Sequence, residues 1–255
     1  MLLAGAAIVI VVAIALIYLA TGSNAAALLK YDGQQIPASM YSQFNISNSN
    51  LQYIGIGSAG NYPIKISSAN NLTVGGKPAV VYQGAEFCPF CAAERWPMII
   101  ALSRFGTFSG LKYMSSDPND PAFPNTPTFS FANATYSSPY ISFVSVEFEN
   151  QTGSPLQTPT PLERALAAKY NSGGGIPFIV FANQSYIEGA TYSPQVLYNM
   201  DWNQVFAQLE NPNSSVSEAI LGSANLITAQ ICKADNNQPA NVCDQTYIKQ
   251  IQKLT

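Results

Sequence analysis

The chain has 255 residues, of which 47% are hydrophobic and only 10% are charged, and it contains no histidine. This composition supplies a substantial core, enough for one large domain or two small ones. A net charge of −3 without any Lys/Arg cluster excludes a protein specialised for nucleic acid, and we expect no such partner. A surface so poor in charge suits a medium in which carboxylates are protonated, so we expect an acidic exterior.

The N-terminal segment is an unbroken apolar run from Leu2 to Ala20. A membrane-spanning helix needs about 20 such residues, whereas the apolar core of a signal peptide has about 7–15. We therefore predict a single-pass anchor over residues 1–22, with membrane contact through residues 2–20. A cleaved signal processed within residues 21–27 and a buried core helix are the alternatives.

The orientation of this anchor is weakly encoded. Lys30 follows the run and no basic residue precedes it, which favours a cytoplasmic body by the positive-inside rule. The cysteine pattern and glycosylation sequons described below favour the opposite side of the membrane. We expect the body to lie outside the cytoplasm.

Residues 23–76 form a spacer and an N-terminal extension rich in Asn, Ser and Gly. A short helix is predicted near Ala38–Phe44. The apolar pieces Leu51–Ile56 and Tyr62–Ile66 predict a hairpin or an extra strand packed on the main domain. Gly75 and Gly76 then form a turn into the next strand.

The most informative stretch is a Cys-Pro-Phe-Cys motif containing Cys88 and Cys91. It lies between a β-rich apolar run, Lys77–Gly84, and a helical pattern over Ala92–Phe105. Unpaired N–H groups and the dipole at a helix N-terminus favour a thiolate, so we expect a lowered pKa for Cys88. Cys91, one turn further in, is the expected resolving thiol.

Two other chemistries are open for this motif. The pair could be an inert structural disulfide or half of a zinc site. Zinc needs about four ligands, and the chain has no histidine and no other cysteine nearby, so no metal and no cofactor are expected. We expect Glu94 and Arg95, just after the motif, to be a solvated pair at the helix start.

The chain continues with alternating strands and helices up to a linker at residues 212–215. The predicted elements are a strand at Leu111–Met114, a loop at Ser115–Thr128, a strand at Ile141–Phe148, a helix from Pro161 to about Tyr170, a strand opening with Ile176-Pro177 and ending at Phe181, a hairpin strand at Ser185–Ile187 and a helix from Ser193 to about Leu209.

The C-terminal part, residues 212–255, is predicted to be a helical hairpin of Val216–Cys232 and Asp244–Leu254. A disulfide between Cys232 and Cys243 would join the two helices; an accessory redox pair is the alternative. Such a disulfide indicates an oxidising compartment. Asn-x-Ser/Thr sequons, which are candidate glycosylation sites, point the same way and begin at Asn45, Asn71, Asn133, Asn150, Asn183 and Asn213.

The order of these elements around the motif resembles the thioredoxin fold over Lys77–Leu209, with an insertion at 111–140. The resemblance implies an α/β domain, residues 77–211, whose mixed sheet is flanked by helices. It implies that Cys88 is the nucleophile and Cys91 the resolving thiol. It also implies that Pro177 is cis and faces the cysteines, while Ile176 offers backbone groups to a substrate peptide.

The chain departs from the thioredoxin pattern at one position. Proteins of that fold usually carry a buried acid six residues before the first cysteine, where it relays a proton to the resolving thiol. Tyr82 occupies this position here. Glu86 and Glu94 are alternative acids, although the motif specifies neither.

A narrower resemblance involves Gly76–Pro78, Gly84–Trp96 and Ala101–Phe108. These segments are similar to an uncharacterised family of membrane-anchored proteins from thermoacidophilic archaea. That likeness supports the fold and the location, and it carries no established activity.

Taken together, these patterns predict a membrane-anchored, extracytoplasmic thiol–disulfide oxidoreductase. Its expected partners are cysteine-containing proteins or a membrane redox partner. The alternative is a redox-inactive structural or binding component of a membrane or envelope assembly.

Overall fold

The computed structural model describes residue 28 and residues 30–67 and 70–255. The predicted anchor at residues 2–20 lies outside this part of the chain. None of the helices in the described ranges combines the length and the hydropathy needed to cross a membrane.

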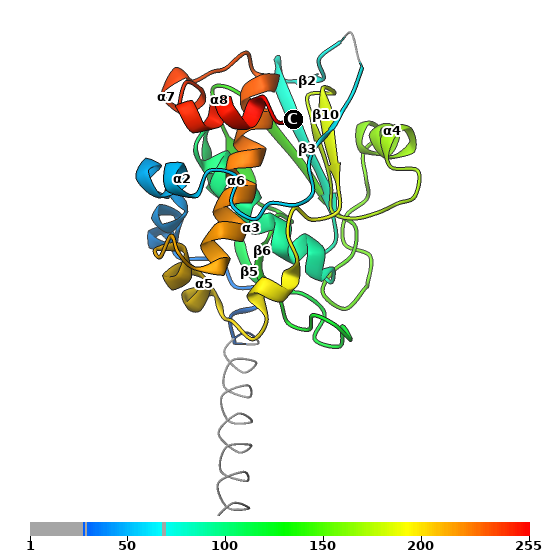
Figure 1. Cartoon of the computed structure of the whole chain (residues 1–255). Coiled ribbons are helices and arrows are strands. Elements are labelled where there is room, and N and C mark those ends of the chain that lie inside the picture. Colours follow the sequence, from blue (N-terminus) through cyan, green and yellow to red (C-terminus); the bar gives the residue numbers. More distant parts are fainter. Residues whose placement is uncertain (1–27, 29, 68–69) are drawn as a thin grey trace, which may run out of the picture.

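A mixed sheet organises the fold (Figure 1). Its strand β3 lies between β8, to which it is parallel, and β9, to which it is antiparallel. Strand β10 follows β9 as a hairpin, and β1 pairs with β10 at the sheet edge. The strands are β1 (Ile64–Lys65), β2 (Thr73–Val74), β3 (Lys77–Gly84), β4 (Thr107–Ser109), β5 (Lys112–Ser115), β6 (Pro127–Ser130), β7 (Thr135–Ser137), β8 (Ser142–Glu147), β9 (Phe178–Phe181) and β10 (Ser185–Glu188).

Helices cover both faces of the sheet, with α4 on one side and α3 and α6 on the other (Figure 1). The helices are η1 (Ala38–Phe44), α2 (Asn48–Ile54), α3 (Pro89–Ser103), α4 (Pro161–Tyr170), η2 (Pro194–Leu197), α5 (Trp202–Leu209), α6 (Ser215–Ala234), α7 (Ala240–Cys243) and α8 (Thr246–Gln252), where η marks a 3-10 helix. The predicted mixed sheet flanked by helices is therefore confirmed.

The two faces follow from the side-chain alternation of β3. Ala79 and Val81 pack with Leu166 of α4, whereas Val80 and Tyr82 belong to the larger cluster on the opposite face. Because both faces are covered, β3 is apolar nearly throughout, which is the pattern that predicted it as a buried strand.

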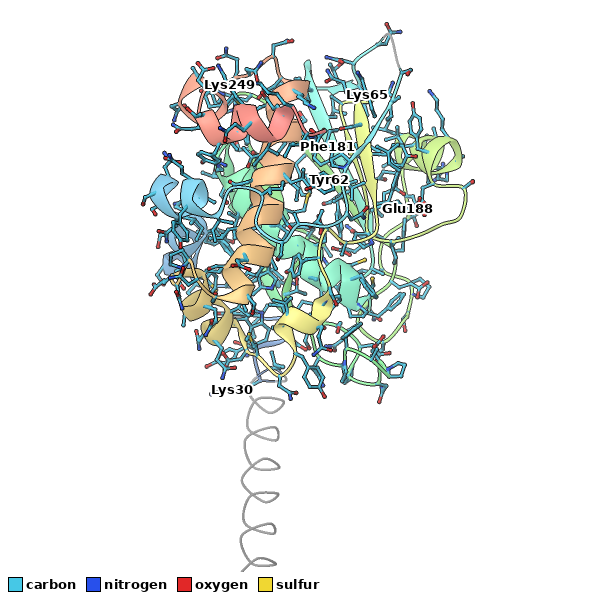
Figure 2. The ribbon with its side chains drawn as sticks, in the orientation of Figure 1. Lys30, Tyr62, Lys65, Phe181, Glu188 and Lys249 are labelled. Carbon is cyan, nitrogen blue, oxygen red and sulfur yellow. A yellow bond between two sulfur atoms is a disulfide. The ribbon has the colours of Figure 1, made fainter. Side chains whose placement is uncertain are left out.

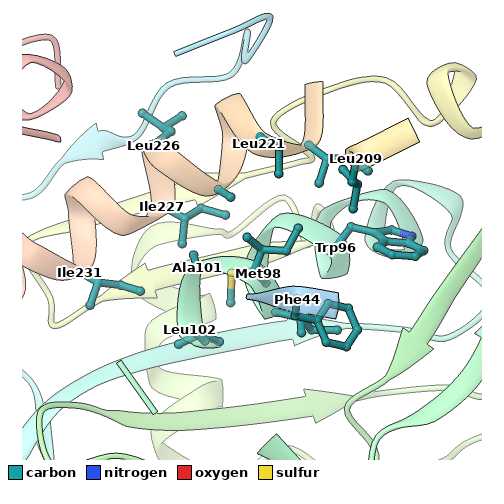
Figure 3. Packing of buried hydrophobic residues seen from close by; sticks show 14 of the residues in the cluster. Phe44, Trp96, Met98, Ala101, Leu102, Leu209, Leu221, Leu226, Ile227 and Ile231 are labelled. Carbon is teal, nitrogen blue, oxygen red and sulfur yellow. The ribbon is translucent and has the colours of Figure 1, made fainter. Parts of the chain in front are cut away.

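The larger cluster is centred on the contact between α3 and α6 (Figure 3). Met98, Ala101 and Leu102 of α3 belong to this cluster, together with Leu226 and Ile227 of α6. The same cluster contains side chains from the N-terminal extension, the insertion at 111–140 and the C-terminal helices. Helix α3 is thus packed against segments from most of the described chain.

Two predicted elements were wrong. The piece Leu51–Ile56 is not a strand but lies mostly in helix α2, which Ser47 caps by accepting the backbone N–H of Asn50 at 3.2 Å. The predicted helix 193–209 is interrupted between η2 and α5. Asp201 forms a capping box at the start of α5, so a strong helix-start signal lies inside the predicted helix.

The predicted disulfide between Cys232 and Cys243 is confirmed. It joins the last turn of α6, which contains Cys232, to the end of the short helix α7, which is Cys243. Helix α8 begins three residues later. Helix α8 corresponds to the predicted second helix, Asp244–Leu254, whereas α7 is an additional short helix at the end of the predicted loop. Helix α6 is buried along most of its length and belongs to the same cluster as α3.

Removing this disulfide should lower stability without affecting the cysteines at residues 88 and 91. It closes a loop with a sequence separation of 11, so loop-closure entropy suggests a loss of about 3 kcal/mol. We expect the double variant Cys232→Ser/Cys243→Ser to show this loss in urea unfolding. Unfolding free energies equal to those of the wild type would contradict it.

Candidate functional site

Cys88 is the N-cap residue of α3, so the predicted helix start is confirmed. Its Sγ accepts the backbone N–H of Cys91 at 3.1 Å, which satisfies one of the unpaired donors of the first turn. Pro89 stands at the first helical position, where a missing N–H costs nothing. Cys88 is 6% exposed and Cys91 is fully buried, and both thiols are free.

The two cysteines have opposite pKa shifts. The side-chain hydrogen bond with Cys91 is the main cause that lowers the pKa of Cys88, with help from backbone N–H groups and the charge of Arg95, while burial opposes it. Burial raises the pKa of Cys91 well above its ordinary value, and the neighbouring Cys88 raises it further. Cys88 therefore ionises first while Cys91 keeps its proton, which is the asymmetry that the predicted roles of attacking and resolving thiol require.

The segment before β9 lies against the cysteines. The Ile176–Pro177 peptide bond is cis, as predicted, and the Cys88 Sγ lies 3.9 Å from the carbonyl oxygen of Ile176. Ile176 also packs on the small apolar cluster of Ala85, Cys88 and Cys91. The structure thus brings the four predicted catalytic residues together.

Asn171 supports this segment, although it was not among the predicted site residues. Its side chain donates to the carbonyl oxygen of Gly175 at 2.7 Å and accepts the Gly175 N–H at 3.0 Å. On the other side, Gly175 lies close to Glu188, the last residue of β10 (Figure 2). A Cβ atom added to Gly175 would lie only 2.8 Å from the Glu188 Oε1 atom, so a larger residue there would crowd this carboxylate. An Asn at the C-cap of a helix and just before a glycine run is the signal that could have found it.

The insertion borders the same site. The backbone N–H of Asp117 donates to the carbonyl oxygen of Phe87 at 2.9 Å. Phe90, between the two cysteines, is 43% exposed and packs edge-on against Phe123 with ring centroids 5.8 Å apart. The turn that carries the cysteines is therefore held from outside by residues 117–123.

A pocket of about 510 Å³ opens beside Phe90. Its other walls come from the N-terminal extension, the loop after β10, η2 and α6; they are Ser58, Gly60, Asn61, Ala190, Thr191, Tyr192, Ser193, Val196 and Ala219. The backbone N–H of Gly60 donates to the Thr191 carbonyl at 2.9 Å, which joins the extension to the loop. Part of the predicted spacer is thus a wall next to the cysteines.

The expectation that Glu94 and Arg95 are solvated was wrong, because both side chains are fully buried. Arg95 forms a bidentate ion pair with Glu147 at the end of β8, at 2.8 Å from Nε and 2.7 Å from Nη2. Although burial alone would lower its pKa, the Glu147 charge raises the pKa of Arg95 well above its ordinary value. The helix start therefore contains a permanent buried cation.

Tyr82, at the position of the expected acid, is fully buried, and its hydroxyl has no hydrogen-bond partner among the described residues. Its ring lies 5.9 Å from the Arg95 guanidinium and 5.1 Å from the Phe131 ring. Burial raises the pKa of Tyr82 well above its ordinary value, so the phenol is neutral. Glu86 is 6% exposed and accepts the Ser130 hydroxyl at 2.5 Å.

Glu94 contacts the loop that lines the pocket. Its Oε2 accepts both the N–H and the hydroxyl of Thr191 at 2.7 Å, while Oε1 has no hydrogen-bond partner among the described residues. Burial raises the pKa of Glu94 to about 7, against the two hydrogen bonds, which lower it. At acidic pH this carboxyl group is neutral, so burying it costs little free energy.

Glu94 should make the protein more stable in acid than at neutral pH. Its raised pKa means that its stabilising contribution is complete below about pH 4.5 and is lost as the pH rises through 7, by roughly 3 kcal/mol. Between pH 4.5 and 8, urea unfolding should therefore show Glu94→Gln gaining about that much relative to wild type. The exposed Glu210→Gln should show no such gain. If the difference in unfolding free energy between wild type and Glu94→Gln stayed the same at every pH, it would contradict a raised pKa for Glu94.

The remaining candidate residues lie in other parts of the fold. Cys232 and Cys243 pair with each other. Within residues 28, 30–67 and 70–255, no group of three or more His, Cys, Asp or Glu is placed to hold a metal ion. The sequon residues are exposed or half-buried; the exposed ones are Asn45, Asn71, Asn133 and Asn213, and the half-buried ones are Asn150 and Asn183.

A family model described as a domain of unknown function, DUF929, matches residues 62–163, about two fifths of the chain. The match includes β3, the cysteine pair, α3 and Glu147, and it ends before Ile176. The searches of curated proteins and of solved structures found no match.

Proposed function

We propose that the chain is a thioredoxin-like thiol–disulfide oxidoreductase that acts on cysteine-containing proteins through Cys88 and Cys91. The observation that carries the proposal is the asymmetry of the pair: a lowered pKa for Cys88 at a helix N-terminus and a raised pKa for the buried Cys91. The sheet arrangement supports the fold, since β8, β3, β9 and β10 are adjacent in this order, with only β8 parallel to β3.

The chemistry is a two-step exchange between sulfur atoms. The Cys88 thiolate attacks one sulfur of a substrate disulfide, a Cys88–substrate bond forms, and the other substrate sulfur leaves as a thiolate that takes up a proton. Cys91 then gives up its proton and attacks the Cys88 Sγ. The Cys88–Cys91 bond forms and the second substrate sulfur leaves, so two electrons pass to the substrate.

The reverse sequence oxidises a substrate dithiol, and both directions use the same geometry. The backbone of Ile176, 3.9 Å from the Cys88 Sγ, is the place where an extended substrate peptide would contact the protein. The pocket beside Phe90 would accept a side chain close to the substrate cysteine.

We further propose that the protein is membrane-anchored through residues 2–20 with its body outside the cytoplasm. The disulfide between Cys232 and Cys243 supports this location, because structural disulfides form in oxidising compartments. A membrane redox partner would then exchange electrons with the cysteine pair.

The test is turnover of a disulfide-bonded model peptide by the full chain in detergent, with dithiothreitol as the electron source. Wild type should accelerate peptide reduction at least tenfold, and Cys88→Ser should abolish the acceleration. The variant Cys232→Ser/Cys243→Ser is the matched control and should retain it. An unaccelerated wild type would reject the proposal.

A redox-inactive structural role is the second candidate, and the small exposure of Cys88, 6%, favours it. In that case Cys88 should resist alkylation by iodoacetamide even after mild reduction of the folded protein. Ready alkylation of Cys88 would exclude this alternative.

A further inference from the structure

We propose that Arg95 is a positioning residue for the cysteine pair, and that its buried guanidinium, held by Glu147, stabilises the Cys88 thiolate from inside the protein. This inference rests on the proposed exchange reaction and assigns the group that tunes it. The sequence offered no such role, since Arg95 was expected to be solvated.

The geometry connects Arg95 directly to the turn that carries the cysteines. Arg95 follows Cys91 by four residues on α3, so the two side chains lie on the same face of the helix. Besides its ion pair, Nη2 donates to the carbonyl oxygen of Ala85 at 2.7 Å. Ala85 packs with Cys88 and Cys91 in one small cluster. The residue that binds the guanidinium through its carbonyl oxygen is therefore also in contact with the two cysteines.

Stability alone does not explain this arrangement. A buried ion pair is often no more stabilising than apolar side chains of the same volume. The pair is also incompletely satisfied, because the Arg95 Nη1 atom has no hydrogen-bond partner among the described residues. A cation kept at such a position acts strongly on nearby charges, since its field is weakly screened in the interior.

The charges around the guanidinium support its action on the thiols. Glu147 faces it directly, and Glu86 lies close enough to raise the pKa of Glu147. Tyr82 is neutral and contributes no charge. The charge of Arg95 helps to lower the pKa of Cys88, and at Cys91 it acts against the burial that raises the pKa of that thiol.

Two variants of the Arg95–Glu147 ion pair should shift the pKa of Cys88 in opposite directions. Glu147→Gln keeps a hydrogen-bond acceptor for Arg95 but removes the opposing charge, so the Cys88 pKa should fall. Arg95→Met with Glu147→Leu removes both charges at similar volume, so the Cys88 pKa should rise, with at least a tenfold loss of thiolate at any pH below the midpoint.

The measurement is the thiolate absorbance near 240 nm as a function of pH, using the reduced full chain in detergent. Circular dichroism would establish that each variant is folded. Arg104→Met is the matched control, because Arg104 lies at the other end of α3 and bonds Tyr247 at 2.8 Å; it should leave the midpoint unchanged.

Folded variants that both shift the midpoint in the same direction, or leave it unchanged, would overturn the inference and assign the ion pair a structural role only. If the double variant does not fold, Glu147→Gln alone decides, and an unchanged or raised midpoint overturns it. The readout needs no catalytic turnover, so it remains decisive for Arg95 even if the exchange reaction itself is not found.

Discussion

Replacing Cys91 with serine should turn a transient mixed disulfide into a stable product. Cys88 can still attack a substrate disulfide, and the backbone N–H of residue 91 still donates to its Sγ, but no thiol remains to expel the substrate from Cys88. A disulfide-bonded peptide incubated with Cys91→Ser should therefore stay attached to Cys88. Mass spectrometry of the non-reduced protein measures this, with a peptide-linked fraction expected to approach completeness.

The control for this trapping experiment is Cys88→Ser, which should capture no peptide because the buried Cys91 thiol keeps its proton. Release of peptide from Cys91→Ser as fast as from the wild type would mean that another thiol, or none, resolves the intermediate. Capture at Cys91 in the Cys88→Ser protein would reverse the assigned roles.

Replacing Trp96 with alanine should cause the largest loss of stability expected from a single core substitution. Its fully buried ring packs against Phe129 of the insertion at a centroid distance of 4.9 Å, against Phe206 of α5 at 5.1 Å and against Phe44 of the extension at 6.4 Å (Figure 3). Its Nε1 also donates to the carbonyl oxygen of Pro127 at 2.8 Å.

We expect Trp96→Ala to lower the free energy of unfolding by about 3–5 kcal/mol, measured by urea denaturation. The control is Leu254→Ala, whose side chain is 61% exposed and whose loss should be within about 0.5 kcal/mol. Equal effects of the two variants would show that the extension, the insertion and α5 do not share one core around α3.

Local signals in the sequence were sufficient for the elements that form the site. The apolar run Lys77–Gly84 gave β3, and the cysteine motif followed by Pro89 gave the helix start. The Ile176-Pro177 pair predicted the start of the following strand, whereas its cis peptide bond was implied by the resemblance to the thioredoxin fold. These signals work because turns, caps and strand openings depend on a few adjacent residues.

The missed features depend on contacts between distant segments. Arg95 and Glu147 are 52 residues apart, so no sequence signal close to α3 could indicate that this arginine is buried and paired. Glu94 likewise finds its partner in Thr191, 97 residues away. Charged residues at a helix start are usually solvated, and only the packing of the loop after β10 and of β8 against α3 reverses that expectation.

Several carboxyl groups have raised pKa values, which fits the expectation of an acidic exterior. Burial raises the pKa of Glu94 and of Asp235 to about 7, and it raises the pKa of Asp32 and Glu147 as well. Carboxyl groups with raised pKa values are stabilising when protonated, so these sites favour the folded chain at low pH. The proposed disulfide exchange would need, in such a medium, a cysteine that still ionises, and the lowered pKa of Cys88 fits that need.

The most direct test of this account is the alkylation of the reduced, folded protein by iodoacetamide across a pH series, with the modified cysteine identified by mass spectrometry. The account predicts that Cys88 is modified first, with a midpoint below that of an ordinary thiol, while Cys91 stays unmodified until well above it. Modification of Cys91 before Cys88, or equal rates at both, would contradict it.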